Sequence, residues 1–166
     1  MSDGIEIIGY DVPAVEKWIS ENTEGLAPPF RWTRLEGGHS NLTYGLEDSV
    51  GNKAVVRRPP MGELLPKAHD MGREFAIISG LGPTEVPVPK AYGYCESPDV
   101  TGAHFYVMRQ VDGKALFELE DALEHLSEEA RESVGLSFMD VLAALHSVDP
   151  DAVSYTHLTL PTNREV

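Results

Sequence analysis

Short stretches of alternating apolar and polar residues fill much of the first two thirds of the chain, and this period of two predicts β-strands. We expect five strands, each bounded by glycine, proline, asparagine or aspartate, at 31–35, 42–48, 52–58, 91–95 and 104–110. Pro59 and Pro60 end the third strand, because proline has no N–H group to donate to a central ladder.

Apolar residues recur at helical spacing in three other stretches. Asp11 is placed to cap a first helix, which ends before Gly25. A second helix is expected from about Pro66 to Gly80, inserted between the third and fourth strands. A long third helix starts near Ser127 and ends before Asp149-Pro150.

The strands cluster instead of alternating with helices, which predicts an α+β fold. The expected architecture is a five-stranded antiparallel sheet with one inserted helix, followed by a helical part.

The chain has 27 acidic and 13 basic residues, and a net charge of −14 disfavours nonspecific binding to nucleic acid or anionic membranes. Many acidic residues lie within residues 118–132. They form either a solvated helical surface or an acidic wall for a cationic substrate. The single cysteine, Cys95, and the absence of an amino-terminal signal pattern fit the cytoplasm.

A glycine-containing loop joins the first two predicted strands and is the first candidate for binding chemistry. Its glycines allow the backbone to approach a ligand closely, and its N–H groups and a serine hydroxyl could hold phosphate oxygens. A plain hairpin turn is the alternative interpretation. The candidate residues are Gly37, Gly38, His39, Ser40 and Asn41.

The third strand and the inserted helix carry a possible charge pair. Alternation along the strand places Val55 and Arg57 on one face and Arg58 on the other. Glu74 lies on the helix that follows. A kinase-type site needs a strand-borne cation for the phosphates and an acid that orients it, so we expect Arg57 and Glu74 to face each other. A solvated surface pair is the alternative.

The fifth strand runs into Asp112-Gly113 and could form a hinge for an adenine ring. Backbone groups of Gln110 and Val111 would then pair with the edge of the base, and Met108 would stand behind it. Taken alone, a core strand followed by a turn explains this segment equally well.

Together these segments resemble the aminoglycoside-phosphotransferase-like family, and in particular its branch related to the kinase domains attached to some acyl-CoA dehydrogenases. The resemblance covers about residues 31–152. It rests on LEGGHSNLTY at 35–44, VRRPP at 56–60, REF at 73–75, VPVPK at 86–90, FYVM at 105–108 and LHSVDP at 145–150.

The resemblance implies a protein-kinase-like fold and transfer of the γ-phosphoryl group of ATP, with Mg²⁺, to a hydroxylated small molecule. Residues 1–110 would form the amino-terminal lobe with its preceding helix, and 111–152 the start of the helical lobe. The family's His-Gly-Asp catalytic loop and its later aspartate metal ligand have no counterpart here, because no Gly-Asp pair follows His146. We therefore expect no catalytic or metal-binding residue in this chain, and no activity from it alone.

Residues 153–166, VSYTHLTLPTNREV, differ in character from what precedes them and resemble translated sequencing-adapter DNA. We expect this tail to be non-native and the natural protein to continue beyond Asp151. Two other functions stay open, a noncatalytic nucleotide-binding pseudokinase module and a purely structural domain. The substrate of the intact protein would be an aminoglycoside, another amino alcohol or a hydroxyacyl thioester.

Overall fold

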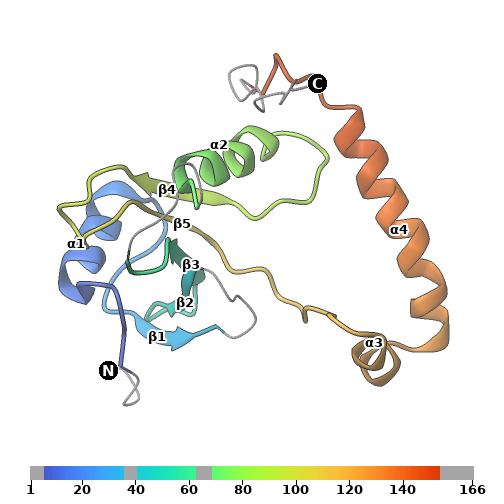
Figure 1. Ribbon diagram of the computed structural model, residues 1–166, viewed down its shortest axis with the longest axis horizontal. Helices are drawn as coiled ribbons and strands as arrows, with labels where there is room; N and C mark the ends of the chain where they lie inside the picture. Colours follow the sequence, from blue (N-terminus) through green and yellow to red (C-terminus); the bar gives the residue numbers. More distant parts are fainter. Residues whose placement is uncertain (1–5, 36–40, 63–68, 154–166) are drawn as a thin grey trace, which may run out of the picture. The chain divides into compact units, whose positions relative to one another are not determined.

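A computed structural model describes residues 6–35, 41–62 and 69–153 of the chain (Figure 1). The chain forms two compact units, and each is described by itself. The first contains residues 1–79 and 89–111, and the second contains 80–88 and 112–166.

The first unit is built on a five-stranded antiparallel sheet with the strand order β1-β2-β3-β5-β4. This arrangement confirms the predicted α+β fold, with strand boundaries that differ by no more than two residues. The strands are β1 (Arg31–Arg34), β2 (Leu42–Glu47), β3 (Lys53–Arg58), β4 (Ala91–Cys95) and β5 (Phe105–Arg109). β3 lies at the centre, between β2 and β5, so both of its edges are hydrogen-bonded.

Helix α1 (Val12–Asn22) packs against one face of this sheet and closes the main core. The Asp11 side chain accepts a hydrogen bond from the N–H of Ala14 and thereby starts the helix, as predicted. Val15 and Ile19 are fully buried among the inward-facing residues of the strands. Those residues include Trp32, Tyr44, Leu46, Ala54, Val56, Phe105 and Val107.

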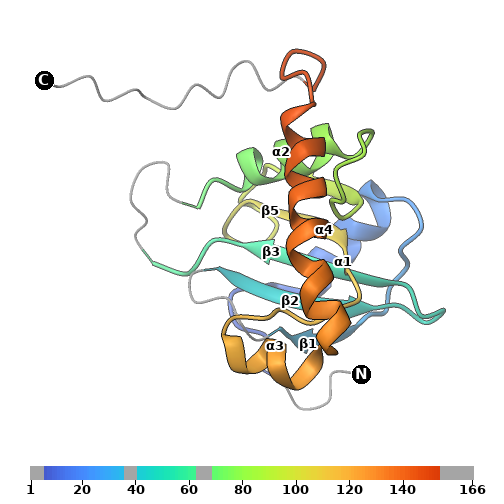
Figure 2. The same ribbon diagram turned by 90° about the vertical axis from the view of Figure 1, so that its right-hand side faces the viewer.

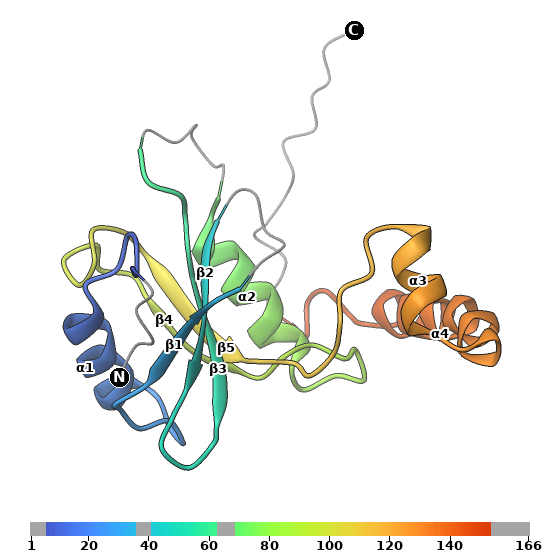
Figure 3. The ribbon, with the colours of Figure 1, turned by 90° about the horizontal axis from the view of Figure 1, so that it is seen from below.

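Helix α2 (Met71–Leu81) lies across the opposite face of the sheet, as Figure 3 shows. Its Phe75 ring stacks on Tyr94 and also contacts Tyr106, with ring centroids 5.8 and 6.2 Å apart. The prediction that this helix starts near Pro66 is wrong for residues 69 and 70, which are not helical. Residues 63–68 lie outside the described residues. His69 has a φ of 56°, which no α-helix accepts, and the Asp70 side chain caps the N–H of Arg73.

The second unit contains α3 (Leu119–His125) and α4 (Glu128–His146), which are seen in Figure 2. Ser127 caps α4 by accepting a hydrogen bond from Ala130, which confirms the predicted start of the long helix. Of the expected tail only Val153 is described, and its carbonyl oxygen lies 2.9 Å from the position that a Cβ on Gly80 would take. Within the described ranges, no helix is both long and apolar enough to cross a membrane.

Candidate functional site

The candidate site lies on the α2 face of the sheet and centres on Arg57 near the end of β3. Alternation along the strand sends consecutive arginines to opposite faces, as predicted. Arg57 is opposite Thr43 of β2 and Tyr106 of β5, so these three side chains share one face. Arg58 is buried on the α1 face, where it contacts the Tyr10 ring.

Arg57 and Glu74 form the expected ion pair. The Arg57 Nε lies 2.9 Å from Glu74 Oε2, and each side chain is 31% exposed. Glu74 stands in the first turn of α2, and its backbone N–H donates to the carbonyl of Asp70. The start of α2 therefore fixes the carboxylate opposite the central strand.

Tyr106 adds a second hydrogen bond to the same carboxylate, and the sequence argument missed it. Its hydroxyl donates to Glu74 Oε2 over 2.9 Å, the same oxygen that receives the Arg57 Nε. Burial and the neighbouring Glu74 carboxylate both raise the pKa of Tyr106, so its hydroxyl stays protonated and remains a donor. Strand alternation could have found Tyr106, because it is two residues from Met108 and shares its face.

Asn41 and His69 complete the cluster from the loop side. The Asn41 amide satisfies both neighbours when its oxygen faces Arg57 and its nitrogen faces His69. Its oxygen then accepts from Arg57 Nη2 at 2.7 Å and Nε at 3.2 Å, and its nitrogen donates to His69 Nδ1 at 2.6 Å. His69 has the only positive φ among described non-glycine residues, so the backbone is strained where its side chain enters the site.

Two residues of β2, Thr43 and Gly45, lie on the same face and are closely packed. The Thr43 hydroxyl oxygen is buried and has no hydrogen-bond partner among the described residues. Gly45 is buried opposite Val55, and a Cβ there would lie 2.7 Å from the Thr33 hydroxyl oxygen and 3.4 Å from Gln110 Oε1. The glycine is therefore needed for close approach of its neighbours.

The hinge prediction needs one correction. Met108 lies opposite Val55, so the two residues share the face of Arg57. The backbone N–H of Gln110, however, donates to the carbonyl of Lys53 over 3.1 Å. It extends the β3–β5 ladder and is not available to the edge of a base. Val111 is 67% exposed and ends the first unit.

The structure thus brings together Asn41, Arg57 and Glu74 of the predicted residues, with Val55 and Met108 on the same sheet face. Gly37, Gly38, His39 and Ser40 lie outside the described residues. Within the described ranges, no group of three His, Cys, Asp or Glu side chains gathers in a way that could hold a metal ion.

This arrangement can bind an anion. Nε and Nη2 of Arg57 are engaged by Glu74 and Asn41, while Nη1 has no partner among the described residues. Because Glu74 and Asn41 hold the guanidinium in place, little side-chain freedom would be lost when Nη1 meets a phosphate oxygen.

Comparison with known proteins agrees with this fold. The profile of the phosphotransferase enzyme family matches residues 31–166. The chain belongs to this phosphotransferase family. Its fold resembles the crystal structure of a Ralstonia eutropha protein assigned as an aminoglycoside phosphotransferase, with a TM-score of 0.75 and 30% identity over 93% of this chain.

Curated relatives of this phosphotransferase-family chain are much longer proteins. It is 32% identical over 151 residues to the probable acyl-CoA dehydrogenase IBR3 of Arabidopsis thaliana, covering 87% of this chain and 18% of the relative. Identity to acyl-CoA dehydrogenase family member 11 of the rat is also 32%, over 89% of this chain and 19% of the relative. The chain spans about a fifth of these relatives and 43% of the Ralstonia protein.

Proposed function

We propose that this chain supplies the nucleotide-binding part of an ATP-dependent phosphotransferase that acts on a hydroxylated small molecule. The observation that carries the proposal is the Arg57–Glu74 ion pair, which joins the central strand to α2 at 2.9 Å inside a fold of the phosphotransferase family. A strand cation oriented by a helix carboxylate is the arrangement that phosphoryl-transfer enzymes of the kinase type use to hold nucleotide phosphates.

The residues present fit an ATP molecule. Nη1 of Arg57 has no partner among the described residues and suits a phosphate oxygen. Val55 and Met108 supply apolar surface for a base further along the same face. We assign the phosphate-contacting role to Arg57 and an orienting role to Glu74.

ATP would supply the transferred phosphoryl group, and Mg²⁺ would neutralise charge on the phosphates. The residues of this chain would bind and orient the nucleotide. The proton acceptor and the metal ligands belong, in this proposal, to the part of the intact protein that the resemblance places after residue 152. The chain alone is therefore expected to bind nucleotide without transferring phosphate.

The proposed substrate is an aminoglycoside, another amino alcohol or a hydroxyacyl thioester. The first class is suggested by the name of the Ralstonia protein, and the last by the acyl-CoA dehydrogenase relatives. No nucleic acid or membrane partner is proposed, because the net charge of −14 opposes both.

A binding experiment tests the nucleotide site. Titration with a fluorescent ATP analogue should give a saturable signal that unlabelled ATP competes away. Arg57→Met should weaken this binding about tenfold or more, because it removes a charge-assisted hydrogen bond to phosphate. Arg31→Met is the matched control. It removes another strand arginine, Arg31 of β1, which pairs with Glu47 of β2. This change should alter the affinity less than twofold.

A turnover experiment separates an enzyme from a binding module. The chain extended from its genomic sequence would be assayed with ATP, Mg²⁺ and members of the three substrate classes. Substrate-dependent ADP formation by the extended protein supports the proposed phosphotransferase. Nucleotide binding without turnover by any of them would instead identify a noncatalytic nucleotide-binding module.

A further inference from the structure

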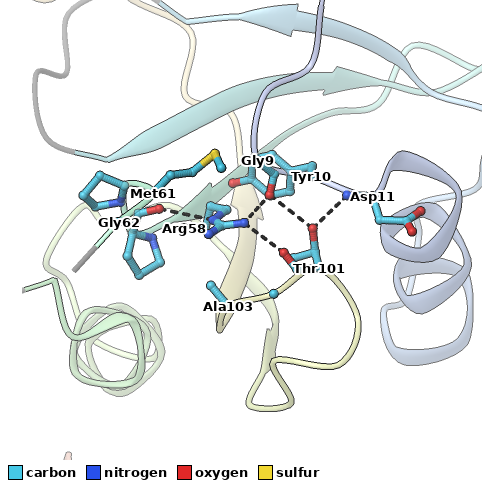
Figure 4. Close-up of a pocket in the computed structure, with 11 residues that line it drawn as sticks. Gly9, Tyr10, Asp11, Arg58, Met61, Gly62, Thr101 and Ala103 are labelled. Carbon is cyan, nitrogen blue, oxygen red and sulfur yellow. Dashed lines mark hydrogen bonds between the residues drawn. The ribbon is translucent and has the colours of Figure 1, made fainter. Parts of the chain in front are cut away.

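A pocket lies on the α1 face of the sheet, around Arg58, on the opposite side from the candidate site. It has a volume of about 600 Å³ and is formed by three segments of the first unit. These segments are Gly9–Asp11 before α1, residues 58–62 at the end of β3, and the turn 101–103 between β4 and β5 (Figure 4). The proposed nucleotide site uses none of these residues.

Arg58 is the only basic residue that lines the pocket, and its charge is not neutralised by any described residue. Its side chain is fixed by neutral acceptors: Nε donates to the carbonyl of Pro59 at 3.2 Å, and Nη1 donates to the carbonyls of Gly9 and Thr101. The residue is only 6% exposed. Figure 4 shows its guanidinium at the centre of the lining residues.

A buried arginine without a counter-ion is unusual, because burying a charge is costly unless an opposite charge accompanies it. Burial indeed lowers the pKa of Arg58. Asp11 does not neutralise the guanidinium, since its carboxylate caps α1 and points away from Arg58 in Figure 4. The Nη2 of Arg58, which carries two N–H groups, has no acceptor among the described residues.

We propose that this pocket binds a small organic monoanion, a carboxylate with a short apolar group, whose carboxylate meets Nη2 of Arg58. The walls favour this class over inorganic phosphate. Pro59, Pro60, Met61 and Ala103 offer apolar surface, and one guanidinium balances one negative charge. A phosphate dianion would keep an uncompensated charge in this partly desolvated site.

Nuclear magnetic resonance of the full chain tests the pocket with sodium propionate as the probe. Sodium chloride at the same ionic strength gives the baseline. We expect propionate to shift the backbone N–H signals of Tyr10 and Gly102 in a saturable way, because each N–H belongs to the peptide group whose carbonyl, of Gly9 or Thr101, holds the Arg58 side chain. Sodium phosphate at the same ionic strength should give no saturable shift of these signals.

Two variants locate the effect without removing the arginine. Ala103→Asp adds a carboxylate to the pocket wall and should weaken propionate binding roughly tenfold by repulsion. Val50→Asp adds the same charge to an exposed turn, where the side chain is 79% exposed, and should leave binding within about twofold.

Three results would overturn the proposal. The first is a signal shift that increases linearly with propionate concentration and does not saturate, as expected for the chloride baseline. The second is saturable binding that Ala103→Asp leaves intact, because the site would then lie elsewhere. The third is saturable binding of phosphate in place of propionate. None of these outcomes depends on nucleotide binding at Arg57, so the two proposals stand or fall separately.

Discussion

Removing the Tyr106 hydroxyl isolates the contact that links β5 to the Glu74 carboxylate. In Tyr106→Phe the ring keeps its contact with Phe75, and only the 2.9 Å hydrogen bond to Glu74 Oε2 is lost. The bond has a charged acceptor and a donor residue that is 2% exposed, but the Glu74 side chain is 31% exposed. A hydrogen bond to a charged group contributes about 1.5–3 kcal/mol, and partial exposure reduces this to about 1 kcal/mol.

The assay is urea unfolding followed by tryptophan fluorescence. Trp18 and Trp32 are the two tryptophans of the chain and both belong to the first unit, so the signal reports the unit that contains Tyr106. We expect Tyr106→Phe to lower the free energy of unfolding by about 1 kcal/mol. Combined with Glu74→Ala in a double-mutant cycle, it should show a coupling energy of similar size.

Tyr94→Phe is the matched control for this cycle. Its hydroxyl pairs with His104 at 2.9 Å, and its ring also stacks on Phe75, but it makes no hydrogen bond to Glu74. The effects of Tyr94→Phe and Glu74→Ala should therefore add. A coupling between Tyr106 and Glu74 below about 0.3 kcal/mol would refute the reasoning, because effects this small are typical of independent residues.

Three further changes test other parts of the first unit. Gly45→Ala should destabilise it by about 1–3 kcal/mol in urea unfolding, because the added Cβ would lie 2.7 Å from Thr33 Oγ1. Burial opposes ionisation of Asp48, but hydrogen bonds from Asn52 and Val50 outweigh it and lower the pKa of Asp48. Asp48 should therefore make the free energy of unfolding larger than in Asp48→Asn. This difference should be complete above the unfolded pKa of about 3.9 and decrease as pH falls through the lower folded pKa. A difference that does not change with pH would contradict this. Cys95 is 2% exposed and burial raises the pKa of its thiol, so Ellman's reagent should react with it only as fast as the unit unfolds, and rapid reaction of the folded protein would be inconsistent with the structure.

The sequence was sufficient to predict the sheet and the central ion pair, because both depend on local periodicity. Alternation placed Arg57 and Arg58 on opposite faces, and the helical pattern placed Glu74 on the next element. The start of α2 was harder to predict. It depends on the hydrogen bond that the Asp70 side chain accepts from the N–H of Arg73 and on a positive φ at His69, and the prediction of a start near Pro66 used neither.

The contacts of the site that sequence reasoning missed are those set by pairing register. Tyr106 reaches Glu74 because β5 pairs with β3 so that Tyr106 stands opposite Arg57. The same register pairs the N–H of Gln110 with the carbonyl of Lys53, and no sequence motif predicts this hydrogen bond. The contact of Asn41 with His69 joins loops 28 positions apart, and only the folded chain brings them together.

The adjacency of Arg57 and Arg58 also restricts how this protein can change by insertion or deletion. β3 is paired on both edges, so losing one residue inside it would move every following side chain to the other face of the sheet. Arg58 would then face α2 and Glu74, and Arg57 would face the core beneath α1. Length changes should therefore be tolerated in the exposed turn at residues 49–52 and rejected within Lys53–Arg58. A library of single-residue deletions scored for folded protein would display this boundary directly.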